Sequence, residues 1–104
     1  MNMNTRYRIT RNADGNQPDQ MMSVDECKSY FETQPDFEYT KEYSFKSAET
    51  TMTIQGDFFL WHVGEATIPF RYYEGDLYVA VSHEIIFQKM LEIADQFNAQ
   101  YVEG

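Results

Sequence analysis

Apolar and polar residues alternate through the middle of the chain, which is the pattern of half-buried β-strands. Residues 57–81, DFFLWHVGEATIPFRYYEGDLYVAV, hold three such runs, separated by Gly64-Glu65 and Glu74-Gly75. Glycine-containing pairs of this kind favour two-residue hairpin turns. With turns at these places, every cross-strand pair on one face is apolar: Trp61 with Ile68, Phe59 with Phe70, Phe70 with Val79, Ile68 with Val81, and Tyr72 with Leu77. The sequence therefore predicts one register for three antiparallel strands.

Gly56-Asp57 has the composition of a further hairpin turn. A turn there adds a fourth strand to the same register, with two more pairs: Ile54 with Phe59 and Met52 with Trp61. Pro69 breaks the pattern, because it lies inside a central strand and cannot donate a hydrogen bond to its neighbour. We expect a bulge or a locally open pairing there.

Three other segments predict strands. Residues 6–10, RYRIT, and residues 37–45, FEYTKEYSF, both alternate, and residues 99–102, AQYV, add a short last strand. The alternation in 37–45 places four aromatic residues on one face: Phe37, Tyr39, Tyr43 and Phe45.

Two segments have the signals of amphipathic helices. Residues 22–35 begin with Ser23 as the N-cap and Glu26 three residues later, which is a capping box. Residues 82–98 begin with Ser82 as the expected N-cap. Their apolar residues recur every three or four positions, so each helix has one apolar stripe.

The order of elements, β-α-β-β-β-β-β-α, predicts an α+β fold: a mainly antiparallel sheet of five to six strands with two helices packed on one face. The chain, 104 residues long, is expected to form a single domain, 1–104. Within it we expect residues 1–4 to be disordered and residues 11–21 to form a loop.

If the helices cover one face of the sheet, the opposite face presents a patch that mixes apolar, aromatic and cationic side chains. Its candidate interaction residues are Phe58, Leu60, His62, Arg71 and Tyr78. Tyrosine, phenylalanine and arginine are typical of interface centres, which favours a protein partner or self-association, for instance as a homodimer. Alternatively, the loop 11–21 folds over this patch, or the sheet curls enough to bury it.

Charge narrows the class of partner. The net charge is −9, and residues 12–104 alone hold five basic and seventeen acidic side chains. Such a surface repels nucleic acid, so we expect no nucleic-acid binding. The acidity instead suggests, as a second function, an inhibitor or immunity-type protein that binds a basic partner such as a nuclease.

Catalytic and metal-binding patterns are weak. His62 and His83 are the only histidines and show no metal-ligand spacing, and Cys27, the only cysteine, lies on an apolar helix stripe where a thiol is usually inert. The acidic pairs Glu74/Asp76 and Glu92/Asp95 are expected to be solvated. We therefore predict no catalytic residue, no metal and no cofactor.

The sequence thus favours a non-enzymatic protein-interaction module that acts through the exposed sheet face. A third alternative is an enzyme or small-ligand binder with a pocket between helix and sheet, near Tyr30, Trp61 and Tyr72. No stretch is apolar enough to span a membrane, and no signal peptide is evident, so a cytoplasmic location without membrane contact is expected.

Overall fold

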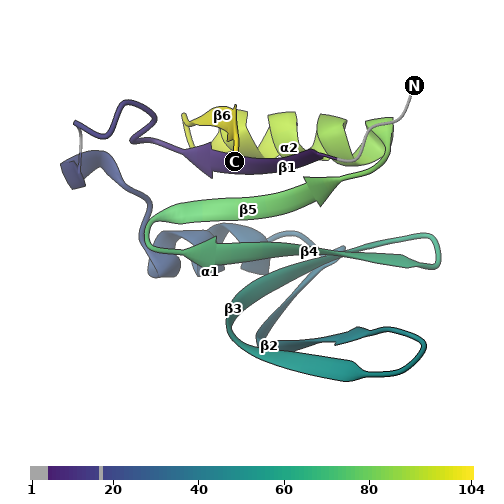
Figure 1. Ribbon diagram of the computed structural model, residues 1–104. Coiled ribbons are helices and arrows are strands. Elements are labelled where there is room, and N and C mark those ends of the chain that lie inside the picture. Colours follow the sequence, from purple (N-terminus) through teal and green to yellow (C-terminus); the bar gives the residue numbers. More distant parts are fainter. Residues whose placement is uncertain (1–4, 17) are drawn as a thin grey trace.

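A computed structural model describes residues 5–16 and 18–104, so the expected disorder of residues 1–4 lies outside the described residues. It shows an α+β fold with a six-stranded antiparallel sheet in the order β2-β3-β4-β5-β1-β6 (Figure 1). The elements are β1 Thr5–Thr10, a 3₁₀ turn Pro18–Gln20, α1 Val24–Glu32, β2 Phe37–Lys46, β3 Thr51–Val63, β4 Ala66–Tyr73, β5 Asp76–Val81, α2 Glu84–Gln96 and β6 Gln100–Glu103. The predicted fold class is confirmed, and the expected last strand is present as β6.

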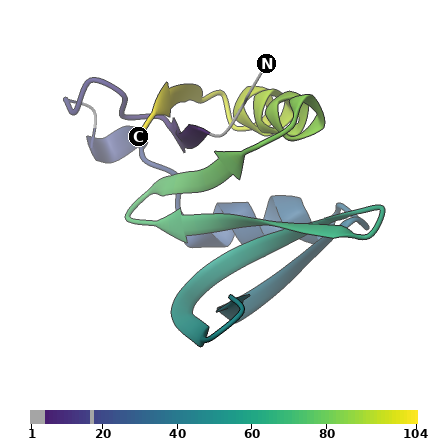
Figure 2. The same cartoon turned by 45° about the vertical axis from the view of Figure 1, so that its right-hand side comes forward.

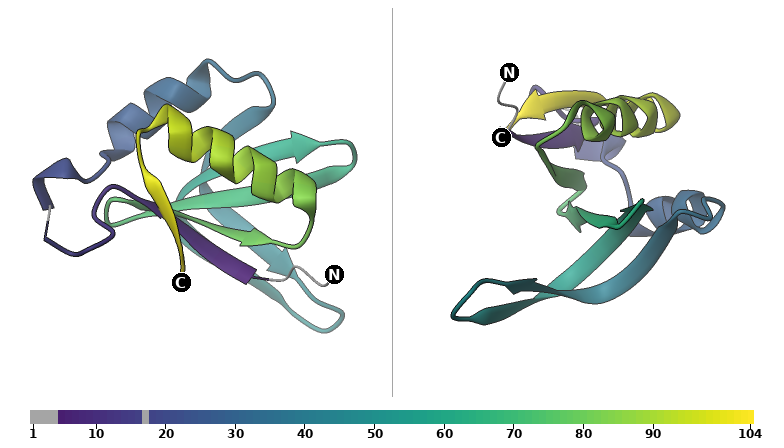
Figure 3. Two further views of the ribbon diagram at one scale, coloured as in Figure 1. Left: turned by 90° about the horizontal axis from the view of Figure 1, so that it is seen from above. Right: turned by 90° about the vertical axis from the view of Figure 1, so that its right-hand side faces the viewer.

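Both helices pack on the same face of the sheet, as predicted (Figure 3). The core between them is made by apolar side chains of α1, α2 and every second position of the central strands. Its most buried members include Ile9, Cys27, Phe31, Phe59, Phe70, Leu77, Val81, Met90 and Ile93. Within the described residues, no helix combines the length and apolar composition needed to cross a lipid bilayer.

The start of α1 follows its sequence signal. The Ser23 hydroxyl accepts a hydrogen bond from the Glu26 amide (3.1 Å), and the Glu26 carboxylate accepts one from the Ser23 amide (3.1 Å), which completes the capping box. Helix α2 begins one residue later than expected, because His83 and not Ser82 is its N-cap, and no side chain caps it.

Arg11 connects the beginning of α1 with the end of α2. Its Nη1 and Nη2 donate to the two carboxylate oxygens of Glu26 at 2.8 and 2.9 Å, and its Nε donates to the Phe97 carbonyl at 2.7 Å. This hydrogen bonding with Arg11 holds the pKa of Glu26 below its ordinary value. One side chain of the loop after β1 therefore fixes both helices.

Two of the three predicted hairpin turns are confirmed. Strands β3 and β4 are joined by Gly64-Glu65, with Trp61 opposite Ile68 and Phe59 opposite Phe70. Strands β4 and β5 are joined by Glu74-Gly75, with Tyr72 opposite Leu77.

The third turn is wrong, because Gly56 and Asp57 lie inside the single strand β3. Thr40 pairs with Phe58 and Glu42 with Gln55, so both Gly56 and Asp57 stand opposite Lys41, as in a β-bulge. The segment before them pairs with β2 instead of folding back: Ile54 lies opposite Tyr43, and Met52 lies opposite Phe45.

The bulge moves the second half of β2 to the other face of the sheet. Phe37 and Tyr39, before it, pack against the helix-side core. Tyr43, after it, contacts the ring of Phe58, and Phe45 contacts Tyr43, on the face away from the helices. The prediction that all four rings share one face is therefore wrong.

A side-chain hydrogen bond stabilises the bulge. The Tyr39 hydroxyl donates to the Asp57 carboxylate. Burial and this bond raise the pKa of Tyr39 to about 12.

The locally open pairing expected at Pro69 is present. Pro69 stays paired with Leu60 of β3, but β4 pairs with β5 only from Arg71 opposite Tyr78 to the turn. The expected pairs of β4 with Val79 and Val81 are absent, since the two strands separate before reaching them. Because proline has no amide hydrogen to donate, the ladder can end here at little energetic cost.

The sheet is strongly bent as well as twisted. The β2–β3 hairpin curves away from β1 and β6 on the side opposite the helices (Figures 2 and 3). The sheet face without helices is therefore concave.

Candidate functional site

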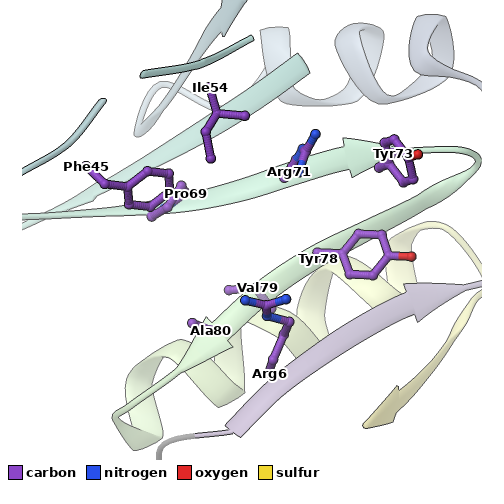
Figure 4. Close-up of a pocket in the computed structure, with 9 residues that line it drawn as sticks. All are labelled: Arg6, Phe45, Ile54, Pro69, Arg71, Tyr73, Tyr78, Val79 and Ala80. Atoms are coloured by element: carbon purple, nitrogen blue, oxygen red, sulfur yellow. The ribbon is translucent and has the colours of Figure 1, made fainter. Parts of the chain in front are cut away.

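The concave face of the sheet contains a hollow of about 400 Å³. It lies where β4 and β5 separate, so the open pairing at Pro69 helps to create it. Its lining comes from β1, β2, β3, β4 and β5: Arg6, Phe45, Ile54, Pro69, Arg71, Tyr73, Tyr78, Val79 and Ala80 (Figure 4). The walls are thus apolar and aromatic, with two arginines and no carboxylate among the lining residues.

Arg71 is held in the hollow by aromatic rings and not by an acid. Its guanidinium carbon lies 5.8 Å from the centre of the Phe58 ring and 5.1 Å from that of Tyr73. The absence of a side chain at Gly56 leaves room beside it, because a Cβ there would be 3.6 Å from the Arg71 Nε. That Nε is buried and has no hydrogen-bond partner among the described residues. A buried donor without a partner is uncommon in proteins, so the hydrogen-bonding capacity of Arg71 is not satisfied by the fold itself.

Arg6 supplies a second positive charge from β1. Its side chain extends from β1 toward β5 across the hollow's edge (Figure 4) and forms no ion pair with the described residues. The other two arginines differ, since Arg8 contacts Asp76 at 3.5 Å and Arg11 binds Glu26. The two arginines without an ion pair among the described residues therefore both line the hollow.

Exposed apolar side chains continue the hollow along the β2–β3 hairpin and the end of β4. Phe45 is 42% exposed, Met52 59% and Tyr73 49%. Phe45 and Met52 face each other across the hairpin, so they extend the apolar surface beyond the hollow itself.

The five candidate residues of the sheet face lie in three different environments. Arg71 and Tyr78 line the hollow. Phe58 and Leu60 face away from the helices as expected but are buried, with exposed fractions of 1% and 9%. The ring of Tyr43 and the guanidinium of Arg71 lie against Phe58, and none of the lining residues comes from 11–21. His62 is exposed outside the hollow, where its ring nitrogens contact Glu38 (2.9 Å) and Thr67 (3.2 Å).

Sequence reasoning did not place five of the lining residues on this face: Arg6, Phe45, Ile54, Tyr73 and Val79. Ile54 was placed on the wrong face because the bulge was taken for a turn, and Phe45 because the alternation of β2 was expected to continue past Lys41. The sequence signal was ambiguous, since glycine is common both in hairpin turns and at bulges.

The other side chains considered as sites are buried or hydrogen-bonded within the fold. Burial raises the pKa of the Cys27 thiol to about 12, which leaves it protonated. Trp61 and Tyr72 were considered for a pocket between helix and sheet, but their polar atoms are bonded within the fold. The Trp61 Nε1 donates to the Asp36 carboxylate (2.9 Å), and the Tyr72 hydroxyl donates to the Met22 carbonyl (2.8 Å). Across the described part of the chain, no cluster of His, Cys, Asp and Glu side chains could hold a metal ion.

No protein-family model, curated protein sequence or solved structure matches the chain. Its function is therefore argued from the geometry of the concave face.

Proposed function

We propose that this chain is a non-enzymatic protein-interaction module that binds its partner through the concave face of the sheet. The observation that carries the proposal is the hollow of about 400 Å³ with aromatic walls and two arginines. Arginine, tyrosine and phenylalanine are the residue types most enriched at interface centres. We place its action in the cytoplasm, in keeping with a single cysteine that is buried and reduced.

The lining residues favour binding over catalysis. They offer guanidinium, phenol and hydrocarbon groups, and none is a histidine, cysteine, serine or carboxylate that could serve as nucleophile or general base near neutral pH. The same groups suit recognition, because rigid rings contribute contact area with little loss of conformational entropy.

The surface is better suited to a macromolecule than to a small molecule alone. Phe45 lines the hollow, and Met52, its cross-strand neighbour, exposes more than half of its surface next to it. A ligand confined to the hollow would leave Met52 in water, whereas a peptide segment lying along β2 and β3 could cover both side chains.

A peptide-display selection tests this proposal. Wild-type protein is used to select from a random peptide library, and selected peptides are then measured against Phe45→Glu and Ile85→Glu. Ile85 is the matched control, because it is an equally apolar, 54% exposed residue on α2, away from the concave face. We expect peptides that bind the wild type and the Ile85 variant but lose at least tenfold in affinity for the Phe45 variant.

Peptides that bind all three proteins equally, or a failure to select any, would overturn the proposal. Binding that ignores Phe45 but weakens steeply with salt would favour the acidic-inhibitor alternative. Light scattering over a concentration series is the parallel test for self-association, and a dimer abolished by Phe45→Glu would identify a second copy as the partner.

A further inference from the structure

We infer that the partner group entering the hollow is a carboxylate of an acidic peptide segment, bound by the guanidinium of Arg71 with an adjacent aromatic or aliphatic side chain between the rings of the hollow. This inference rests on the proposed function and specifies the chemistry of its partner.

The first argument is the state of Arg71. Its guanidinium lies near two rings that restrict its orientation. Its Nε is buried and unpaired within the described residues, so an incoming group would meet the two terminal nitrogens, Nη1 and Nη2. A guanidinium presents paired N–H donors in a plane, which matches the two oxygens of a carboxylate. Because the rings hold the fork before binding, less conformational entropy is lost when a carboxylate arrives.

The second argument is the distribution of charge. Of the four arginines, Arg8 and Arg11 are neutralised by Asp76 and Glu26, while Arg6 and Arg71 line the hollow without an acid. In a chain of net charge −9, two uncompensated cations beside one hollow are complementary to an anionic group.

The third argument selects among anions. Nucleic acids and other polyanions are repelled by the acidic body of the protein, whereas a single carboxylate places one charge beside the two arginines. The apolar part of the lining, which includes Phe45 and Ile54, requires an apolar group next to that charge. A second copy is disfavoured, because a two-fold contact through this face would bring the uncompensated arginines of both copies together.

The test compares two peptides of nearly equal shape, acetyl-Glu-Phe-amide and acetyl-Gln-Phe-amide. Binding to the ¹⁵N-labelled wild type is followed by the Nε–Hε signal of Arg71. We expect the acidic peptide to shift this signal in a saturable way and to bind about tenfold more tightly than the amide, as a charge-assisted bidentate pair allows at a partly exposed site.

Variants and a small acid complete the design. Arg71→Gln should reduce binding of the acidic peptide to that of the amide, while Lys46→Gln, which removes one charge from the end of β2 outside the hollow, should change it less than twofold. Arg71→Lys keeps the charge but lacks the planar fork, so it should recover only part of the preference. Free 3-phenylpropionate should bind more weakly than the acidic peptide, because it cannot cover the β2–β3 surface.

Three results would overturn the inference: equal binding of the two peptides, no response of the Arg71 signal, or binding of 3-phenylpropionate as tight as that of the acidic peptide. All three comparisons use only the wild type, so a variant that fails to fold does not affect them. If displayed peptides depend on Phe45 but carry no acidic residue, the proposed function stands and this inference fails.

Discussion

Replacement of Arg11 by methionine should weaken the attachment of both helices, because one guanidinium bonds to the start of α1 and the end of α2. The lost contacts are two hydrogen bonds to the Glu26 carboxylate, one to the Phe97 carbonyl, and a ring contact of 5.9 Å with Phe97. Methionine retains much of the apolar stem of arginine, so the substitution mainly removes the charge and the donors.

The expected loss of stability follows from the exposure of the partners. The Glu26 side chain is 38% exposed, so its ion pair with Arg11 is screened by water and contributes only about 1 kcal/mol. The hydrogen bond to the carbonyl adds about 1 kcal/mol, and the ring contact adds about 0.5 kcal/mol. We therefore expect Arg11→Met to lower the free energy of unfolding by about 2.5 kcal/mol at neutral pH.

The part due to Glu26 must depend on pH. Because Arg11 lowers the pKa of Glu26 in the folded protein, this contribution is fully present above the ordinary value of 4.5 and is lost as the pH falls through the folded-state pKa. The hydrogen bond to Phe97 persists, since the guanidinium and the carbonyl do not titrate there. The difference between wild type and Arg11→Met should thus fall by about 1 kcal/mol once the pH is below the folded-state pKa of Glu26.

Urea unfolding followed by the fluorescence of Trp61, the only tryptophan, measures this effect without adding salt. Glu26→Gln and the double variant complete a thermodynamic cycle, in which the coupling energy should be about 1 kcal/mol at neutral pH and near zero in acid. A coupling energy that is absent at neutral pH, or unchanged in acid, would refute the reasoning.

Two other predictions concern backbone conformation and thiol chemistry. Gly64→Ala should lower the free energy of unfolding by about 1 kcal/mol, because the φ of Gly64 is +59° while an added Cβ would meet nothing within 4 Å. Gly75→Ala should lower it by at least about 1 kcal/mol more, because the φ of Gly75 is +89° and an added Cβ would also lie 2.9 Å from the Cβ of Met21. Equal losses in urea unfolding would contradict this comparison. Cys27, with a pKa near 12, should react with a thiol-specific disulfide reagent at pH 8 only as fast as the protein unfolds, and rapid labelling of the native protein would show that its burial is overstated.

Local patterns predicted most of the fold. The turns at Gly64-Glu65 and Glu74-Gly75 were correct because each turn and the alternation beside it specify the same register. The first helix was correct because the capping box involves only residues three apart, Ser23 and Glu26.

The concave face was harder to predict, because it depends on which strands lie opposite each other. Gly56-Asp57 suits a hairpin turn and a bulge equally well, and only its pairing with β2 decides between them. The bulge leaves Phe45 and Ile54 on the concave face. Pro69 was recognised as an interruption of the pattern. The hollow beside it could not be predicted, because it arises from the separation of β4 from β5.

The position of β1 has a consequence for how a newly made chain folds. β1 precedes all other strands in sequence, yet it lies between β5 and β6, with Tyr7 opposite both Val79 and Glu103. The β2–β5 meander can form from neighbouring segments during synthesis, whereas β1 must wait until β5 and then β6 have left the ribosome. Such distant pairings slow folding and leave apolar strand edges unpaired in the meantime. During synthesis, the unpaired β1 and the open edge of β5 are therefore the segments most in need of a chaperone.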